Sequence, residues 1–243
     1  MAEISLSVSS NVDLLTRYFE QIANNLANVN TTGFKRQRSS FMEALQSQLA
    51  SPEGIPSPQL NIEQTVDFSQ GTLIQTGRSL DLALAGRGFF VLETPDGPRY
   101  TRNGLFQVNG TGQIVDTQGR MVAGEGGPIV LPPGTDLSRL SVRADGAIAA
   151  GPIPIGRFRV VDFTDQQDQL TPVGNGCFQA PPNVAAAPAQ EVSVRQGFQE
   201  SSNVQTVEEL VDMISVSRLY DANLRVLAAN REASRSILDV AMG

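Results

Sequence analysis

The sequence predicts an α+β protein, in which a discontinuous helical domain formed by the N- and C-terminal helices carries an inserted all-β domain of sandwich or barrel type. Apolar residues recur at helical spacing near both ends of the 243-residue chain. Between the ends, short apolar runs alternate with glycine-containing turn signals, which is typical of all-β domains. We therefore expect residues 1–34 and 200–243 to form a helical assembly domain, 35–70 an extended linker and 71–199 the β domain.

The first predicted helix carries a single apolar stripe. Its apolar side chains follow one another at alternating steps of four and three residues: Val8, Val12, Leu15, Phe19, Ile22, Leu26 and Val29. This heptad spacing favours a helix that packs along one narrow face. The preceding stretch Ser5–Asp13 lacks strong helix formers, so we expect the helix to start near Val12 and to end at Gly33.

The second predicted helix begins at Thr206, where Thr206–Glu209 fits a capping box. Two apolar rows follow it. The first row contains Met213, Val216, Tyr220, Leu227 and Ile237, interrupted by Asn223, Asn230 and Ser234. The second row contains Leu219, Ala222, Val226, Ala229, Ala233 and Val240. Together the rows make a face that is wider than one partner helix can cover.

The middle of the chain is expected to be β structure. Leu80–Ala85 and Gly88–Leu92 are strand candidates, and Ile155–Phe163 is the longest one. Turn signals such as Asn103-Gly104 and Asp145-Gly146 separate the runs.

Composition excludes several function classes. The net charge is −7 and no dense basic tract occurs, which argues against nucleic acid as a partner. The chain has no histidine, the commonest general base and metal ligand. The single cysteine, Cys177, cannot form an intramolecular disulfide and is expected to be a small buried hydrophobe. We therefore expect no catalytic residue, no metal, no cofactor and no small-molecule substrate.

The N-terminal sequence lacks the basic and apolar regions of an ordinary secretory signal. No run approaches the roughly 20 apolar residues that a membrane-spanning helix needs. If the protein leaves the cytosol, we expect another export route.

The terminal helices point to assembly. Exposed apolar stripes of this size usually mark a partner surface. If one face of each subunit meets a different face of the next, the contact repeats without closing and builds a helical tube. The alternative is that both helices simply pack on the β domain.

Four separated blocks resemble the flagellar rod and hook protein family. They are Ile22–Lys35, Thr76–Val91, Tyr100–Phe106, and Glu200–Val204 followed by Ser217–Asn223. Two more segments, Gly124–Ile129 and Ile155–Phe158, most resemble one particular rod protein of the family. The distal rod protein is the near alternative.

The resemblance implies a structural subunit of the bacterial flagellar basal-body rod, and not an enzyme. Its partners would be other rod subunits, further copies of itself and the flagellar type III export apparatus. It would be exported without a cleaved signal peptide and would join the rod where the rod crosses the periplasm.

We expect the subunit interface to be formed by residues of both terminal segments. They are Leu15, Phe19, Ile22, Asn24, Asn25, Leu26, Asn28, Val29, Gly33, Phe34, Asn203, Val204, Val216, Tyr220, Asn223, Leu227 and Asn230. The three clustered amides Asn24, Asn25 and Asn28 would bond neighbouring subunits, although helix capping with solvent exposure is the alternative. The basic cluster Lys35–Arg38 is expected to form a solvated face, and the alternative is contact with an acidic neighbouring subunit or with the membrane-ring base.

Two other functions compete with assembly. A glycosidase would need a pair of carboxylates, and Asp162/Asp165 or Glu208/Glu209 are the available pairs. The first pair is near an expected loop and the second lies in the capping box, so neither pair demands a catalytic role. A β-rich cell-surface binding module would leave the heptads at both ends unexplained.

Overall fold

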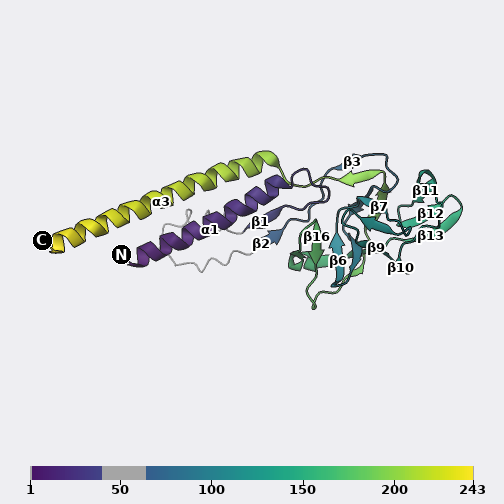
Figure 1. Cartoon of the computed structure of the whole chain (residues 1–243), viewed down its shortest axis with the longest axis horizontal. Coiled ribbons are helices and arrows are strands. Elements are labelled where there is room, and N and C mark those ends of the chain that lie inside the picture. The colour runs from purple at the N-terminus through teal and green to yellow at the C-terminus, as the bar shows by residue number, and fades with distance from the viewer. Residues whose placement is uncertain (1, 40–63, 243) are drawn as a thin grey trace. The chain divides into compact units, whose positions relative to one another are not determined.

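The computed structural model describes residues 2–39 and 64–242, and it is a mixed α and β protein with terminal helices and a strand-rich core (Figure 1). In the outer parts of the two helices, residues 2–11, 230–231 and 233–242, only the backbone is described. The described residues divide into two compact units. The first contains those of Met1–Asn28, Gln37–Thr65 and Val204–Gly243, and the second contains Val29–Arg36 and Val66–Asn203.

The first unit is built on α1 (Ala2–Ala27) and α3 (Thr206–Met242), which run side by side (Figure 1). A short pair of strands accompanies them, β1 (Gln37–Ser39) and β2 (Gln64–Val66). The second helix begins at Thr206, as the capping signal predicted.

The expected limits of the first helix were wrong at both ends. The helix begins at Ala2 and not near Val12, because Ala2–Asn11 contains no Pro or Gly, and serine costs only about 0.5 kcal/mol per residue relative to alanine. It ends at Ala27 and not at Gly33. The Asn28 side chain and the Asn28 amide both donate to the Asn24 carbonyl, at 2.9 Å and 3.2 Å, and these bonds close the last turn of the helix.

The second unit is built from short strands. Its first strands are β3 (Leu73–Gln75), β4 (Leu82–Gly86), β5 (Phe89–Thr94), β6 (Gly97–Thr101), β7 (Phe106–Val108), β8 (Ile114–Asp116), β9 (Met121–Gly124) and β10 (Gly127–Pro128). The next are β11 (Leu140–Val142), β12 (Ala147–Ala150), β13 (Ile153–Arg157), β14 (Val160–Asp162), β15 (Thr171–Pro172), β16 (Cys177–Gln179), β17 (Ala187–Pro188), β18 (Val192–Gln196) and β19 (Phe198–Glu200). Two short 3-10 helices, Leu137–Arg139 and Thr164–Gln169, lie between strands.

The main antiparallel sheet has the strand order β15-β16-β6-β5-β9-β8-β7, with β10 added to β9 and with β14 pairing both β5 and β17. A separate sheet has the order β11-β12-β13. Two further pairs join strands that are distant in sequence, β18 with β4 and β19 with β3. The last strands of the unit therefore close onto its first strands.

The expected long strand Ile155–Phe163 is broken into two. The break falls between β13 and β14, where the chain passes from the small sheet to the main sheet. Phe158 is buried at this point and its amide donates to the Gly146 carbonyl, while the Arg159 amide donates to the Ala123 carbonyl. Because each sheet takes a different part of the run, one apolar stretch supplies two strands.

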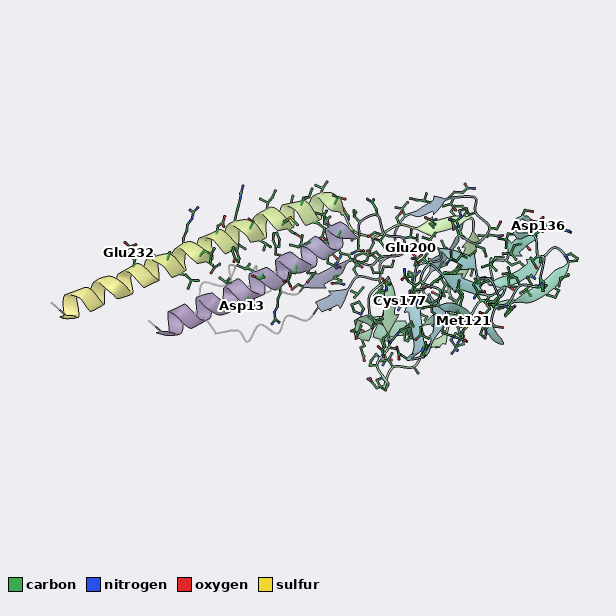
Figure 2. All side chains as sticks on the ribbon, in the orientation of Figure 1. Asp13, Met121, Asp136, Cys177, Glu200 and Glu232 are labelled. Atoms are coloured by element: carbon green, nitrogen blue, oxygen red, sulfur yellow. The ribbon has the colours of Figure 1, made fainter. Side chains whose placement is uncertain are left out.

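Strand β5 is buried on both faces. Phe90 and Leu92 point into one apolar cluster, which also holds Cys177, and Phe89 and Val91 point into another. Successive side chains of a strand point to opposite faces, and in β5 each face packs into a different apolar cluster. Cys177 lies among the strands (Figure 2), and it is the buried hydrophobe that the sequence predicted.

Candidate subunit interface

Helices α1 and α3 meet along an apolar seam. Leu15, Tyr18 and Ile22 of α1 are buried against Val216 of α3. Four more side chains pack partly against this seam, namely Leu14, Met213, Leu219 and Tyr220. Tyr18 takes the place that the sequence pattern gave to Phe19, which is 41% exposed.

A buried polar network ties the two helices to β1. The Asn25 amide donates to the Gln37 carbonyl at 2.8 Å and to Glu209 Oε2 at 3.2 Å, and its oxygen accepts from the Gln37 amide at 2.9 Å. The Gln21 side chain also donates to the Gln37 carbonyl, at 2.7 Å. Asn25 and Glu209 are each 1% exposed. The polar groups of this seam thus fix the register of α1 against α3.

The predicted interface residues differ widely in exposure. Buried members are Leu15, Ile22, Asn25, Gly33, Val204 and Val216. Half-buried members are Leu26, Asn28, Val29, Phe34, Asn203, Tyr220, Asn223 and Leu227. Phe19 and Asn24 are exposed, and the side chain of Asn230 lies outside the described part. The structure places Val29, Gly33, Phe34 and Asn203 in the second unit, and the others in the first.

Beside the seam lies an apolar groove of about 300 Å³. Its walls are Leu15, Thr16 and Phe19 from α1, and Val216, Ser217 and Tyr220 from α3. Four of the predicted interface residues therefore meet in one concave surface.

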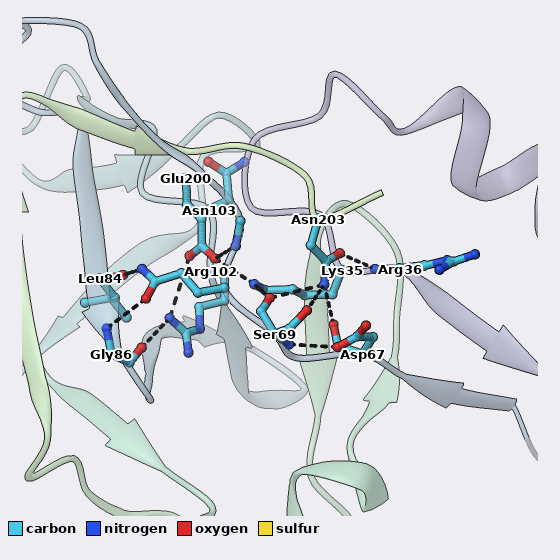
Figure 3. A network of polar contacts seen from close by, with 12 residues as sticks. Lys35, Arg36, Asp67, Ser69, Leu84, Gly86, Arg102, Asn103, Glu200 and Asn203 are labelled. Carbon is cyan, nitrogen blue, oxygen red and sulfur yellow. Dashed lines mark hydrogen bonds and ion pairs between the residues drawn. The ribbon is translucent and has the colours of Figure 1, made fainter. Parts of the chain in front are cut away.

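In the second unit, three charged residues that are far apart in sequence form an ion triad, Lys35, Arg102 and Glu200 (Figure 3). Lys35 Nζ lies 2.6 Å from Glu200 Oε1, and both side chains are 0% exposed. Arg102 Nη1 lies 3.6 Å from Glu200 Oε2. The expectation of a solvated basic face is therefore wrong for Lys35, because Glu200 supplies a buried partner that a local charge pattern cannot reveal.

Backbone groups add further hydrogen bonds around the triad. Lys35 Nζ donates to the Ser69 carbonyl at 2.7 Å, Arg102 Nη1 donates to the Gly86 carbonyl at 2.8 Å, and the Gly71 amide donates to Glu200 Oε1 at 3.0 Å. Burial lowers the pKa of Lys35, and the negative charge of Glu200 opposes that shift. Burial also lowers the pKa of Arg102, again against the attraction of Glu200.

Asn203 and Gly33 hold the same region together (Figure 3 shows Asn203). Asn203 accepts from the Arg36 amide at 2.7 Å and donates to the Asp67 carbonyl at 2.8 Å. The Gly33 amide donates to the Glu200 carbonyl at 2.7 Å. Residues 33–36, which precede the strands of the second unit, are therefore hydrogen-bonded to residues 200–203 at the end of those strands, through side-chain and backbone groups.

The triad was not predicted from the sequence, although each member lies inside one of the blocks that carried the family resemblance. The available signal was a charged residue inside a largely apolar or turn-rich block. Among the described residues, no cluster of three His, Cys, Asp or Glu side chains could hold a metal ion. No helix in the described part combines the length and the apolar character that crossing a membrane requires.

Comparison with protein families identifies three matching segments. Residues 83–150 match the family described as flagellar hook protein FlgE/F/G D1 domain. Residues 195–240 match the flagellar basal body rod FlgEFG protein C-terminal family, and residues 20–35 match the flagella basal body rod protein family.

Curated relatives match over most of the chain. The flagellar basal-body rod protein FlgF of Caulobacter vibrioides is 33% identical, covering 93% of this chain and 92% of the relative. FlgG of Agrobacterium fabrum is 32% identical, covering 92% and 94%. FlgF of Salmonella typhimurium is 34% identical, covering 85% of each chain.

Proposed function

This chain belongs to the family of flagellar basal-body rod proteins, and from that membership we propose that it assembles through its paired terminal helices into the drive shaft that transmits motor torque. It is a structural rod subunit of the flagellar basal body and not an enzyme. Rod subunits assemble with other flagellar rod and hook proteins, and the proposal extends the partners to further copies of this chain.

The level of the chain in the rod belongs to the same proposal. We place it with the FlgF proteins, because Gly124–Ile129 and Ile155–Phe158 most resemble FlgF and because the Caulobacter FlgF covers nearly the whole chain. The alternative is a distal rod protein like FlgG, which the Agrobacterium relative represents at nearly the same identity.

The proposed route to the rod is the flagellar type III export apparatus, without a cleaved signal peptide. The rod segment that the chain would join is the one crossing the periplasm.

The proposed architecture is a discontinuous helical domain that carries an inserted β domain. Residues 1–34 with 200–243 would form the assembly domain, 35–70 the linker and 71–199 the β domain, whereas the compact units group residues 29–36 and 200–203 with the β strands. The side-by-side arrangement of α1 and α3 supports the first part, and the antiparallel strands from β3 to β19 support the last.

A single observation carries the assembly proposal. The seam between α1 and α3 buries Leu15, Tyr18, Ile22 and Val216, yet an apolar groove and exposed apolar side chains such as Phe19 remain on the same helices. Apolar surface that its own subunit leaves uncovered is what a further helix would bury.

The test is complementation of a strain that lacks this chain. The full-length chain is expected to restore motility and to appear in purified basal bodies. A chain ending at Val204 keeps every residue of the second unit but loses α3, so it is expected to be absent from basal bodies and to leave the strain non-motile.

The competing functions give different results. Basal bodies that contain the shortened chain at the full-length level would contradict assembly through the helices. Release of soluble glycan from peptidoglycan by the purified full-length chain would favour the glycosidase. Ligand binding that the shortened chain retains, with motility unaffected, would favour a β-rich binding module.

A further inference from the structure

We propose that the outer face of the first turns of α3 docks into the groove between α1 and α3 of a second copy of this chain. The inference rests on the proposed function and specifies which surfaces of the helices meet. Each copy would offer one surface of each kind.

The first surface is an apolar ridge formed by Val207, Leu210, Val211 and Ile214. These side chains are 74%, 43%, 57% and 54% exposed, respectively. Their spacing of i, i+3, i+4 and i+7 places them on one stripe of the helix. Glu209 and Val216, which face α1, lie on the other side of α3. The ridge belongs to neither of the two apolar rows that the sequence pattern indicated.

The second surface is the groove walled by Leu15 and Phe19 on one side and by Val216 and Tyr220 on the other. Its volume of about 300 Å³ is at the lower end of the range for small-molecule sites. A groove between two helices that is lined by aliphatic and aromatic side chains suits the apolar stripe of a third helix. Recognition of a helix by such a groove uses anchors at the i, i+3, i+4 and i+7 spacing of the ridge.

A subunit cannot fill this groove with its own ridge. Val207–Ile214 and Val216–Tyr220 are consecutive parts of the continuous helix α3, so their separation and relative direction are fixed. A ridge from a second copy has no such restriction. Because ridge and groove are different surfaces, the contact is heterologous and leaves one free ridge and one free groove, which lets the arrangement repeat.

The area of the contact indicates whether a single ridge and groove can hold two copies together. Four side chains that are about half exposed offer on the order of a few hundred Å², whereas a stable pair of proteins buries about 800 Å² on each partner. A single contact is therefore too small to hold two copies together in dilute solution. It is sufficient where each subunit has several neighbours that bind at the same time.

The test replaces Val211 with the photo-cross-linking amino acid p-benzoylphenylalanine during synthesis of the full-length chain, so that irradiation of purified basal bodies cross-links whatever covers position 211. The expected product has twice the mass of the chain, and its cross-linked peptide contains Phe19 or Tyr220. The matched control carries the same cross-linker in place of Asn24, an exposed position on α1 that does not line the groove, and its yield of that peptide is expected to be at least tenfold lower.

Other products would overturn the proposal. A cross-link from position 211 to residues 40–63 of the same chain, or to a different rod protein, means that another occupant covers the ridge. Basal bodies that contain the chain with the cross-linker at position 211 but give no self-product also contradict the docking, while the proposed function stands. Absence of the unmodified chain from basal bodies would instead contradict the proposed function.

A second variant keeps the test independent of cross-linking. Val211→Glu places a charge on the ridge without touching the seam, so the helical circular dichroism signal is expected to be unchanged. Its amount in basal bodies is expected to fall at least tenfold relative to Asp221→Ala, an exposed substitution farther along α3. Equal incorporation of both variants would contradict the docking.

Discussion

Glu200 is the carboxylate at the centre of the buried ion triad in the second unit. A single carboxylate faces two cations, Lys35 and Arg102, and none of the three side chains is more than 2% exposed. A buried ion pair adds little net stability compared with an apolar pair, but loss of one partner leaves a buried charge uncompensated. The triad therefore matters most when it is broken.

Glu200→Gln is expected to lower the free energy of unfolding at pH 7 by about 3–5 kcal/mol, because two buried cations lose their counter-ion. Urea unfolding followed by circular dichroism measures the change. Glu191→Gln, an exposed neighbour in sequence, is the control and is expected to change stability by less than about 0.5 kcal/mol. Equal effects of the two substitutions would contradict the role given to Glu200.

The cost of Glu200→Gln is expected to be smaller at pH 10 than at pH 7. Burial lowers the pKa of Lys35 in the folded chain below its ordinary value of 10.5. At pH values between the folded pKa of Lys35 and 10.5, the unfolded chain binds more protons than the folded chain does. The contribution of Lys35 to the free energy of unfolding therefore rises with pH in this range. Removal of Glu200 lowers the folded pKa of Lys35 further and extends that rise towards neutral pH. Unfolding curves of both proteins at the two pH values test this, and a cost that grows with pH would contradict it.

Gly33 is required where the chain passes close to another backbone segment. Its φ is +70°, and a Cβ at this position would lie 2.5 Å from the Asn103 amide nitrogen. Gly33→Ala is therefore expected to cost about 3 kcal/mol or more. Gly77→Ala is a matched control, since its φ is +74° but nothing lies within 4 Å, and it is expected to cost about 1 kcal/mol. Thermal unfolding measures both variants, and Gly33→Ala is expected to have the lower melting temperature. Equal melting temperatures would contradict the close backbone approach at Gly33.

At the scale of elements, the Asn25 side chain links α1 to both β1 and α3 through hydrogen bonds. Asn25→Ala removes the hydrogen bonds to both backbone groups of Gln37 and to Glu209, and it is expected to destabilise the helix pair by about 2–4 kcal/mol. Asn24→Ala next to it is exposed and is expected to have an effect within about 0.5 kcal/mol. Thermal loss of the helical circular dichroism signal measures both, and equal midpoints would contradict the internal role of Asn25.

The register of the seam between α1 and α3 could not be predicted from the apolar pattern of the sequence. The heptad pattern predicts the stripe Leu15, Phe19, Ile22 and Leu26, whereas the structure buries Leu15, Tyr18, Ile22 and Asn25. Both sets satisfy steps of three and four, and either aromatic could occupy the seam. The choice is made by Gln37, whose backbone groups give the Asn25 amide its partners. Spacing alone cannot include such a partner from another element.

At the scale of the whole chain, the second unit is closed by its last strands. β18 pairs with β4 and β19 with β3, and Glu200 ends β19. A chain that ends at Gln190 loses both pairings and the triad, so it is expected to be digested rapidly by a protease. A chain that ends at Val204 retains them and is expected to resist digestion at the full-length rate within the β unit. Equal digestion of the two would contradict closure by these strands.

The terminal helices and the strand-rich middle were predictable because their signals are local. Apolar periodicity marks the helices, and the turns near Asn103 and Asp145 separate the strands. The break between β13 and β14 and the burial of Lys35 were not predictable in this way. Each depends on a partner brought by the fold, Gly146 and Ala123 in the first case and Glu200 in the second.

The positions of Lys35 and Glu200 in the chain impose an order of events. They lie 165 residues apart, so whichever end of the polypeptide emerges first from a ribosome or a narrow pore, the ion pair must wait until that whole span has emerged. In a chain that emerges with its N-terminus first, the lysine and the arginine lack Glu200 until then, and in one that emerges with its C-terminus first, Glu200 and the arginine lack the lysine. A partly emerged chain is thereby kept from settling into its final shape, and threading can continue without the need to pull a finished body apart.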